Sequence, residues 1–122
     1  MSDVYHSIYD KLDKIGVFGI KNYAVIENAP HVPLCIDRLS DDTYALSQNP
    51  IIEGVVVADP DIEIKVYPER KTAEPMAFQD RSGRKVVYPE PGKVDLKVKN
   101  DLITFLDRWL TELINQGFIR NQ

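Results

Sequence analysis

Apolar residues recur at helical spacing near both ends of the chain and at every second position in its middle. The first stripe consists of Tyr5, Ile8, Leu12 and Ile15. Spacings of three and four residues predict an amphipathic helix over residues 3–15. Ser2 is a suitable N-cap, and Gly16 suits the left-handed position just past the helix end. Val17 would then pack back onto the helix.

A second stripe near the C-terminus is the strongest pattern in the chain. It consists of Leu102, Phe105, Leu106, Trp109, Leu110 and Leu113. These residues predict one apolar helix face, capped at its start by Asp95 or Asn100. Gly117 would end the helix, and Phe118 would fold back onto Leu113. This helix is expected to cover the apolar face of a sheet.

The middle of the chain alternates between short β-type runs and turn residues. Candidate strands are 21–28, 32–39, 43–48, 60–67, 73–79 and 84–88. Ile62, Ile64 and Val66 alternate with polar residues, as in a strand with one buried face. Ser40–Thr43 and Ser82-Gly83 suit tight turns between antiparallel neighbours. Residues 49–58 fit either a strand or an apolar crossing loop.

These elements predict an α+β fold with two layers. An antiparallel sheet of five or six strands would form a meander, with the N- and C-terminal helices packed on one face. At 122 residues the chain fits one domain, 1–122, large enough to fold without a metal or a disulfide. Function is then to be sought on the sheet face opposite the helices.

Composition places the chain among globular proteins, with 43% apolar and 28% charged residues. No apolar run approaches the ~20 residues of a membrane span. The N-terminus lacks the basic start and apolar segment of a signal peptide. With Cys35 as its one cysteine, the chain forms no internal disulfide, and we expect a cytoplasmic protein.

The net charge of −4 argues against general nucleic-acid binding, for which a basic surface is expected. The charge is unevenly divided, since residues 1–63 carry −7 and residues 64–122 carry +3. Such a division could favour association between copies of the chain, or it could be chance clustering on a folded surface.

Three carboxylates at alternate positions form the first candidate site. Asp59, Asp61 and Glu63 would project from one face of a strand and could hold Ca²⁺ or Mg²⁺. The glycine and the bidentate glutamate of a calcium loop are missing. We therefore favour a solvated strand face.

Cys35, with His31 upstream and His6 in the first helix, offers the groups of a Cys-His nucleophile. No family signature surrounds the cysteine, and an inert, half-buried thiol is the favoured interpretation. Two histidines and one cysteine also give no zinc spacing. We expect no cofactor.

Basic residues near strand ends form the last candidate. They are Arg70, Lys71, Arg81, Arg84 and Lys85, with Tyr67, Tyr88 and Phe78 nearby. If they converged, they could bind a nucleotide or a phosphorylated ligand. Interleaved acidic residues favour a mixed, solubilising surface instead.

Several segments resemble a known family of uncharacterised small proteins from bacteria and phages. The resemblance runs from Ala58–Glu63 through Ala73–Pro75, Phe78–Asp80 and Val87–Pro89 to Leu102–Leu110 and Gln116–Phe118. More distantly, the chain is similar to the YqiB-like family, also of unknown function. The family pattern has a histidine near position 48 and a Gly-Asp pair, whereas this chain has Gln48 and Gly54-Val55. The resemblance implies a shared fold and an intracellular location, but it does not indicate any particular activity.

We hypothesise a non-catalytic protein-interaction or binding module acting through the outward residues Glu63, Lys65 and Tyr67, with Arg70 and Arg84 as further candidates. Its partner would be another protein, since small proteins on mobile elements often bind host or competitor proteins, and a homo-oligomer is a further option. The alternative is an enzyme or small-ligand binder using Asp59, Asp61 and Glu63 or the Arg70/Arg84 region. The sequence leaves open whether the protein is an enzyme, and we favour the view that it is not.

Overall fold

The computed structural model describes residues 3–120. Its elements, in chain order, are α1 (Val4–Ile15), the short 3-10 helix η1 (Val17–Gly19), β1 (Tyr23–Asn28), β2 (His31–Arg38), β3 (Thr43–Gln48), β4 (Ile51–Ile52), β5 (Val55–Val56), β6 (Asp61–Tyr67), β7 (Thr72–Asp80), β8 (Gly83–Val86) and α2 (Leu96–Gln116). The α+β fold is confirmed.

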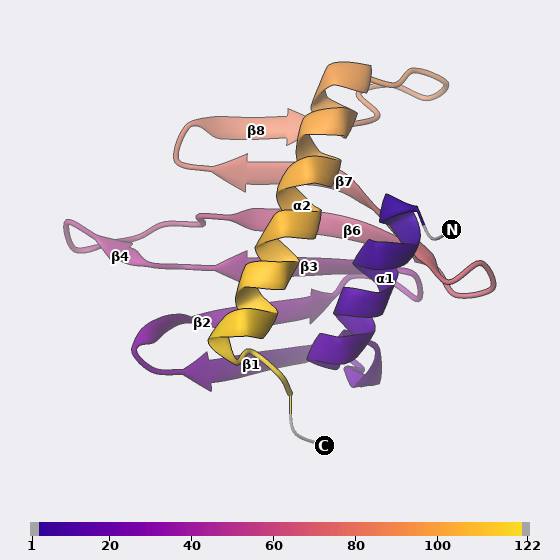
Figure 1. Ribbon diagram of the computed structural model, residues 1–122. Helices are drawn as coiled ribbons and strands as arrows, with labels where there is room; N and C mark the ends of the chain where they lie inside the picture. Colours follow the sequence, from indigo (N-terminus) through magenta and orange to yellow (C-terminus); the bar gives the residue numbers. More distant parts are fainter. Residues whose placement is uncertain (1–2, 121–122) are drawn as a thin grey trace.

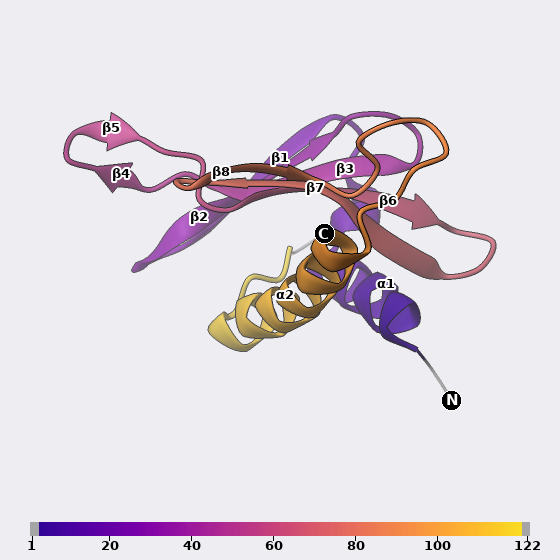
Figure 2. The same cartoon turned by 90° about the horizontal axis from the view of Figure 1, so that it is seen from above.

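Six strands form one antiparallel sheet in the order β1-β2-β3-β6-β7-β8. Both helices lie on the same face of this sheet, and no helix of the described part of the chain covers the opposite face (Figures 1 and 2). The predicted meander is therefore confirmed, with one insertion. Between β3 and β6 the chain leaves the sheet to form a separate hairpin, β4-β5.

Local signals set the ends of both helices. Asp95 caps α2 by accepting a hydrogen bond from the Val98 N–H, and Gly117 ends it at φ 101°. The Phe118 N–H donates to the Leu113 carbonyl at 3.0 Å, as a Schellman motif requires. In α1 the cap is Asp3, whose side chain accepts from the His6 N–H. The predicted cap Ser2 lies outside the described residues.

The core lies between the helices and the covered face of the sheet. Its fully buried members include Ile8, Leu12, Leu34, Ile36, Leu46, Ile62, Ile64, Leu106, Leu110 and Phe118. A polar link also joins the two helices, because the Asp107 carboxylate accepts from Lys11 Nζ at 2.7 Å and from Ser7 Oγ at 2.8 Å.

Pro75 lies within β7, where a proline removes a donor from the ladder. The register accommodates it, because Glu63 pairs with Ala77 and the next residue, Ile64, pairs with Pro75. Met76 is thus the extra residue of a β-bulge. Strand β8 pairs with β7 from Ala77 to Asp80, so the first half of β7 lies beyond the end of β8.

Residues 49–58, for which the sequence left two interpretations, form an exposed β-hairpin that we call the arm (Ile51–Val56). Ile51 pairs with Val56 and Ile52 with Val55 around a turn in which Glu53 and Gly54 both have positive φ. Positive φ at both positions is typical of a two-residue hairpin turn. Figure 2 shows the arm projecting beyond the end of the six-stranded sheet, away from both helices.

Candidate functional site

The uncovered side of the six-stranded sheet, which we call the open face, carries most of the residues singled out in the sequence. Cross-strand pairing aligns Tyr23, Asp37, Ala45, Glu63, Ala77 and Val86 in one row. The next row is Val25, Cys35, Ser47, Asp61, Gln79 and Arg84. Because strand residues alternate between faces, these side chains all point away from α1 and α2.

Glu63, Lys65 and Tyr67 share the open face of β6, as the alternation with Ile62, Ile64 and Val66 predicts. The Lys65 ammonium lies 5.4 Å from the centre of the Tyr67 ring. The Arg70 guanidinium lies 5.6 Å from the same ring. Two cations thus converge on one tyrosine at this end of the sheet.

Arg70 and Arg84 do not converge. Arg70 lies in the β6–β7 turn, whereas Arg84 pairs with Gln79 near the other end of β7. Arg84 instead lies 3.7 Å from the Glu63 carboxylate, a half-exposed ion pair. The sheet therefore separates the basic residues into two groups.

The acidic residues form a different cluster from the predicted trio. Asp59 lies outside β6, which begins at Asp61, and so does not share the strand alternation. Asp61 and Glu63 are on the open face, with Asp37 close to Asp61. Among residues 3–120, no group of three or more potential ligands is placed to hold a metal ion.

Burial and the neighbouring Glu63 and Asp37 carboxylates raise the pKa of Asp61 above its ordinary value of 3.8, although Arg84 acts in the opposite direction. The folded protein therefore binds this proton more tightly than the unfolded chain does. Stability that depends on Asp61 is present at low pH and is lost as the pH rises through the raised pKa.

We accordingly expect Asp61→Asn to stabilise the protein modestly at about pH 7 and to lose this advantage at about pH 3, where the native carboxyl is protonated. Thermal unfolding at both pH values measures the effect. Asp10→Asn, which removes a negative charge from an exposed site on α1, is the control. A destabilised Asp61→Asn at neutral pH would contradict the expectation.

Cys35 lies on the open face between Val25 and Ser47. Its thiol is 3.6 Å from the Asn49 side-chain nitrogen. A hydrogen bond between Tyr23 and the Cys35 thiol raises the pKa of Tyr23. The histidines lie elsewhere: the His31 ring is tilted against the Phe118 ring with 5.9 Å between their centres, and His6 is hydrogen-bonded to Asp3. The groups of a Cys-His nucleophile are therefore not brought together.

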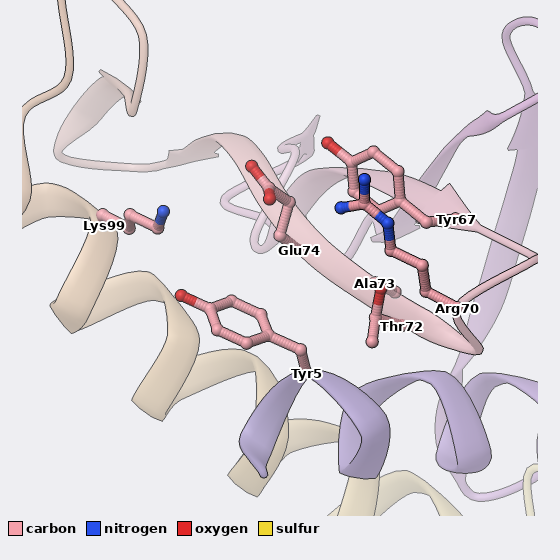
Figure 3. A pocket seen from close by; sticks show the side chains of 7 residues that line it. All are labelled: Tyr5, Tyr67, Arg70, Thr72, Ala73, Glu74 and Lys99. Carbon is pink, nitrogen blue, oxygen red and sulfur yellow. The ribbon is translucent and has the colours of Figure 1, made fainter.

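A pocket of about 300 Å³ opens where the first half of β7 meets the helix layer (Figure 3). It is lined by Tyr5 of α1, Lys99 of α2, and Tyr67, Arg70, Thr72, Ala73 and Glu74 of the β6–β7 hairpin. Figure 3 shows the Tyr5 hydroxyl directed toward Lys99, with Arg70 and Tyr67 on the other side of Glu74. The pocket is thus continuous with the Tyr67 end of the open face.

Hydroxyl groups and charges are closely coupled around this pocket. The Tyr88 hydroxyl donates to the Glu74 carboxylate at 2.6 Å, and this bond raises the pKa of Tyr88. Burial alone would lower the pKa of Lys99, but Tyr88, Tyr5 and Glu74 together raise it. Lys99 is therefore held as a cation, 5.8 Å from the rings of both Tyr5 and Tyr88.

The pocket combines charged groups with hydroxyl groups. Arg70 and Lys99 supply fixed positive charge, and Tyr5, Tyr67 and Thr72 supply hydroxyl groups. Burial and the Glu74 carboxylate also raise the pKa of Tyr67, which keeps its hydroxyl a donor. The sequence pointed to Tyr67 and Arg70 but not to Tyr5, Glu74 or Lys99.

The long helix α2 does not meet the requirements of a membrane span, and neither does any other helix in residues 3–120.

A one-sided antiparallel sheet backed by two helices, with a charged open face, defines the structural class. The sequence of residues 3–119 matches a family described as a domain of unknown function, DUF6908. The chain belongs to this family, as the resemblance to an uncharacterised family predicted. No curated protein and no solved structure matches the chain.

Proposed function

We propose that this protein is a non-catalytic interaction module that binds another protein through the arm and the adjoining open face of its sheet. The arm carries the proposal. Its large side chains are exposed to an extent unusual for apolar residues in a strand: 72% for Ile51, 61% for Val55 and 67% for Val56.

The arm is apolar on both of its faces. Ile51 and Val56 form one cross-strand pair and Ile52 and Val55 the other, and the two pairs point to opposite sides. A hairpin that lies in water would present polar residues on at least one side, and an isolated two-stranded hairpin is at best marginally stable. Exposed apolar clusters of this kind mark surfaces that are covered by a partner.

The open face supplies the polar part of the same surface. Glu63, Lys65, Tyr67 and Arg84 offer both signs of charge and one aromatic ring, which give specificity more than affinity. The partner would therefore combine an apolar groove for the arm with charged groups complementary to β6. Stable interfaces typically bury ~800 Å² of surface on each partner, and an interface of that size would require both the arm and the open face.

The setting that fits this proposal is cytoplasmic. The resemblance to small bacterial and phage-borne proteins, and the more distant one to the YqiB-like family, support a role in binding host or competitor proteins. We take residues 1–122 to act as a single domain.

Removing the apolar surface of the arm should abolish partner binding without unfolding the domain. Ile51→Thr/Val56→Thr removes the apolar surface from the face of the arm that carries its two most exposed side chains, while the β-branched threonines preserve strand propensity. Because the arm projects away from the core, we expect a stability change within about 0.5 kcal/mol. Unfolding in urea measures stability, and recovery of a partner by the tagged protein from host extract measures binding.

Two further variants complete the design. Glu63→Ala/Lys65→Ala should weaken the binding of the same partner, because both side chains lie on the open face. Glu112→Ala, at an exposed position on α2, should not affect its recovery. Unchanged recovery by both the arm and the open-face variants, or equal loss in Glu112→Ala, would refute the proposal.

The pocket of Figure 3 supports a second candidate function, the binding of a small polar ligand whose anionic groups would face Arg70 and Lys99 and whose donor group would face the Glu74 carboxylate between them. Its volume is at the lower end of the range for small-molecule sites, ~300–1,000 Å³. Thermal-shift screening with nucleotides, inorganic phosphate, dicarboxylates and divalent metals tests it, since specific binding raises the unfolding midpoint. A shift that Arg70→Ala and Lys99→Ala each abolish would support this function, and no shift with any compound would dismiss it.

A further inference from the structure

The sheet has two free edges, and they differ in chemistry. At one edge, β8 presents Arg84 and Lys85, with Arg81 in the preceding turn, all exposed. Two copies of β8 brought side by side would place like charges against each other. Charged edges of this kind prevent strand-to-strand association.

The other edge, β1, has no such protection. Within residues 3–120, β1 is the outermost strand at this border of the sheet (Figure 1). Between Lys21 and Glu27 the edge contains no charged residue. On its open-face side, Tyr23 is 57% exposed and Val25 is 44% exposed.

The hydrogen-bond pattern shows which backbone groups of β1 have no partner in the sheet among residues 3–120. The Arg38 N–H donates to the Asn22 carbonyl at 2.8 Å, so Asn22 and Arg38 form a bonded pair. Antiparallel pairs alternate between bonded and non-bonded positions. Tyr23 and Val25, opposite Asp37 and Cys35, are therefore at non-bonded positions, and their N–H and C=O groups point outward from the edge.

A second copy of the same edge matches these groups. When two β1 strands run antiparallel about a two-fold axis through Ala24, Tyr23 of one copy lies opposite Val25 of the other. Their outward N–H and C=O groups are then placed to exchange hydrogen bonds. In the same register Lys21 of each copy lies opposite Glu27 of the other, so opposite charges meet at both ends of the seam.

We propose that the protein forms a two-fold dimer in which β1 pairs with β1 of a second copy, joining the two sheets into one. The interface is isologous, as in most homodimers. It places Tyr23 and Val25 of both copies in one aromatic–aliphatic row on the open face. The dimer leaves the arm and Glu63, Lys65 and Tyr67 free, so it does not depend on the proposed partner function.

The seam is short compared with interfaces of obligate dimers, so the association should be concentration-dependent, with a dissociation constant in the micromolar range. Sedimentation equilibrium over a concentration series measures it. We expect a monomer–dimer equilibrium that Val25→Lys removes, because this change places a lysine beside the partner's edge. Circular dichroism checks that the variant is folded.

A charge exchange tests the register itself. Lys21→Glu and Glu27→Lys should each weaken the dimer at least several-fold, because like charges then face each other at both ends. The double variant Lys21→Glu/Glu27→Lys should restore it. Lys85→Glu on β8 is the matched control and should leave the dimer unchanged.

A monomer at every concentration would overturn the proposal, as would a dimer unaffected by Val25→Lys or not restored by the charge exchange. A dimer lost in Ile51→Thr/Val56→Thr but retained in Val25→Lys would assign self-association to the arm and exclude β1.

Discussion

Replacing Phe118 with alanine is expected to lower the free energy of unfolding by about 3–5 kcal/mol. Phe118 follows the glycine that ends α2, yet its side chain is 0% exposed. It turns back into the core beside His31, and two residues later the Arg120 N–H donates to the Ile15 carbonyl at 2.8 Å. Phe118 thus packs the end of α2 against the start of β2, and the Arg120 bond joins the same segment to α1.

The neighbouring residue is the matched control for this variant. Ile119 is 43% exposed, and Ile119→Ala should cost no more than about 0.5 kcal/mol. Urea unfolding followed by the fluorescence of Trp109 measures both. Equal effects of the two substitutions would show that Phe118 does not anchor the helix.

Replacing Ile64 with alanine is expected to cost about 2–5 kcal/mol. Ile64 lies on the covered face of β6, near the middle of the sheet, and is fully buried. The next residue, Lys65, points to the open face, and Lys65→Ala should change stability by no more than about 0.5 kcal/mol.

The same pair of variants separates folding from binding. Lys65→Ala removes the ammonium 5.4 Å from the Tyr67 ring, so it should weaken the partner interaction in a fully stable protein. Chemical unfolding and partner recovery, measured side by side, test the contrast. A large loss of stability in Lys65→Ala would mean that the open face contributes to the core.

The ends of the helices could be predicted because the signals that set them are local. Asp95 and the Gly117-Phe118 pair act on backbone groups within one turn. The alternation in β6 likewise follows from the burial of one sheet face. Each of these features depends on residues close together in the sequence.

The arm and the pocket depend on relations that the sequence does not contain. A short apolar run such as residues 51–57 has the same pattern in a buried strand, a loop or an exposed hairpin. The pocket assembles Tyr5, Glu74 and Lys99 from three elements far apart in the chain. Arg70 lies in the turn before β7 and Arg84 follows the turn after it, so the length of β7 separates them. The sequence shows both residues near turns but does not show how far apart the two turns lie.

Site-specific photo-crosslinking in the native host tests the central claim most directly. A photoreactive residue would be placed at Val56 on the arm, at Lys65 on the open face, and at Glu112 on the outer face of α2. We expect the arm and open-face positions to crosslink to the same protein partner and the α2 position to crosslink to none. Crosslinks from Glu112 alone, or none from Val56 and Lys65, would contradict the assignment of binding to the arm and the open face.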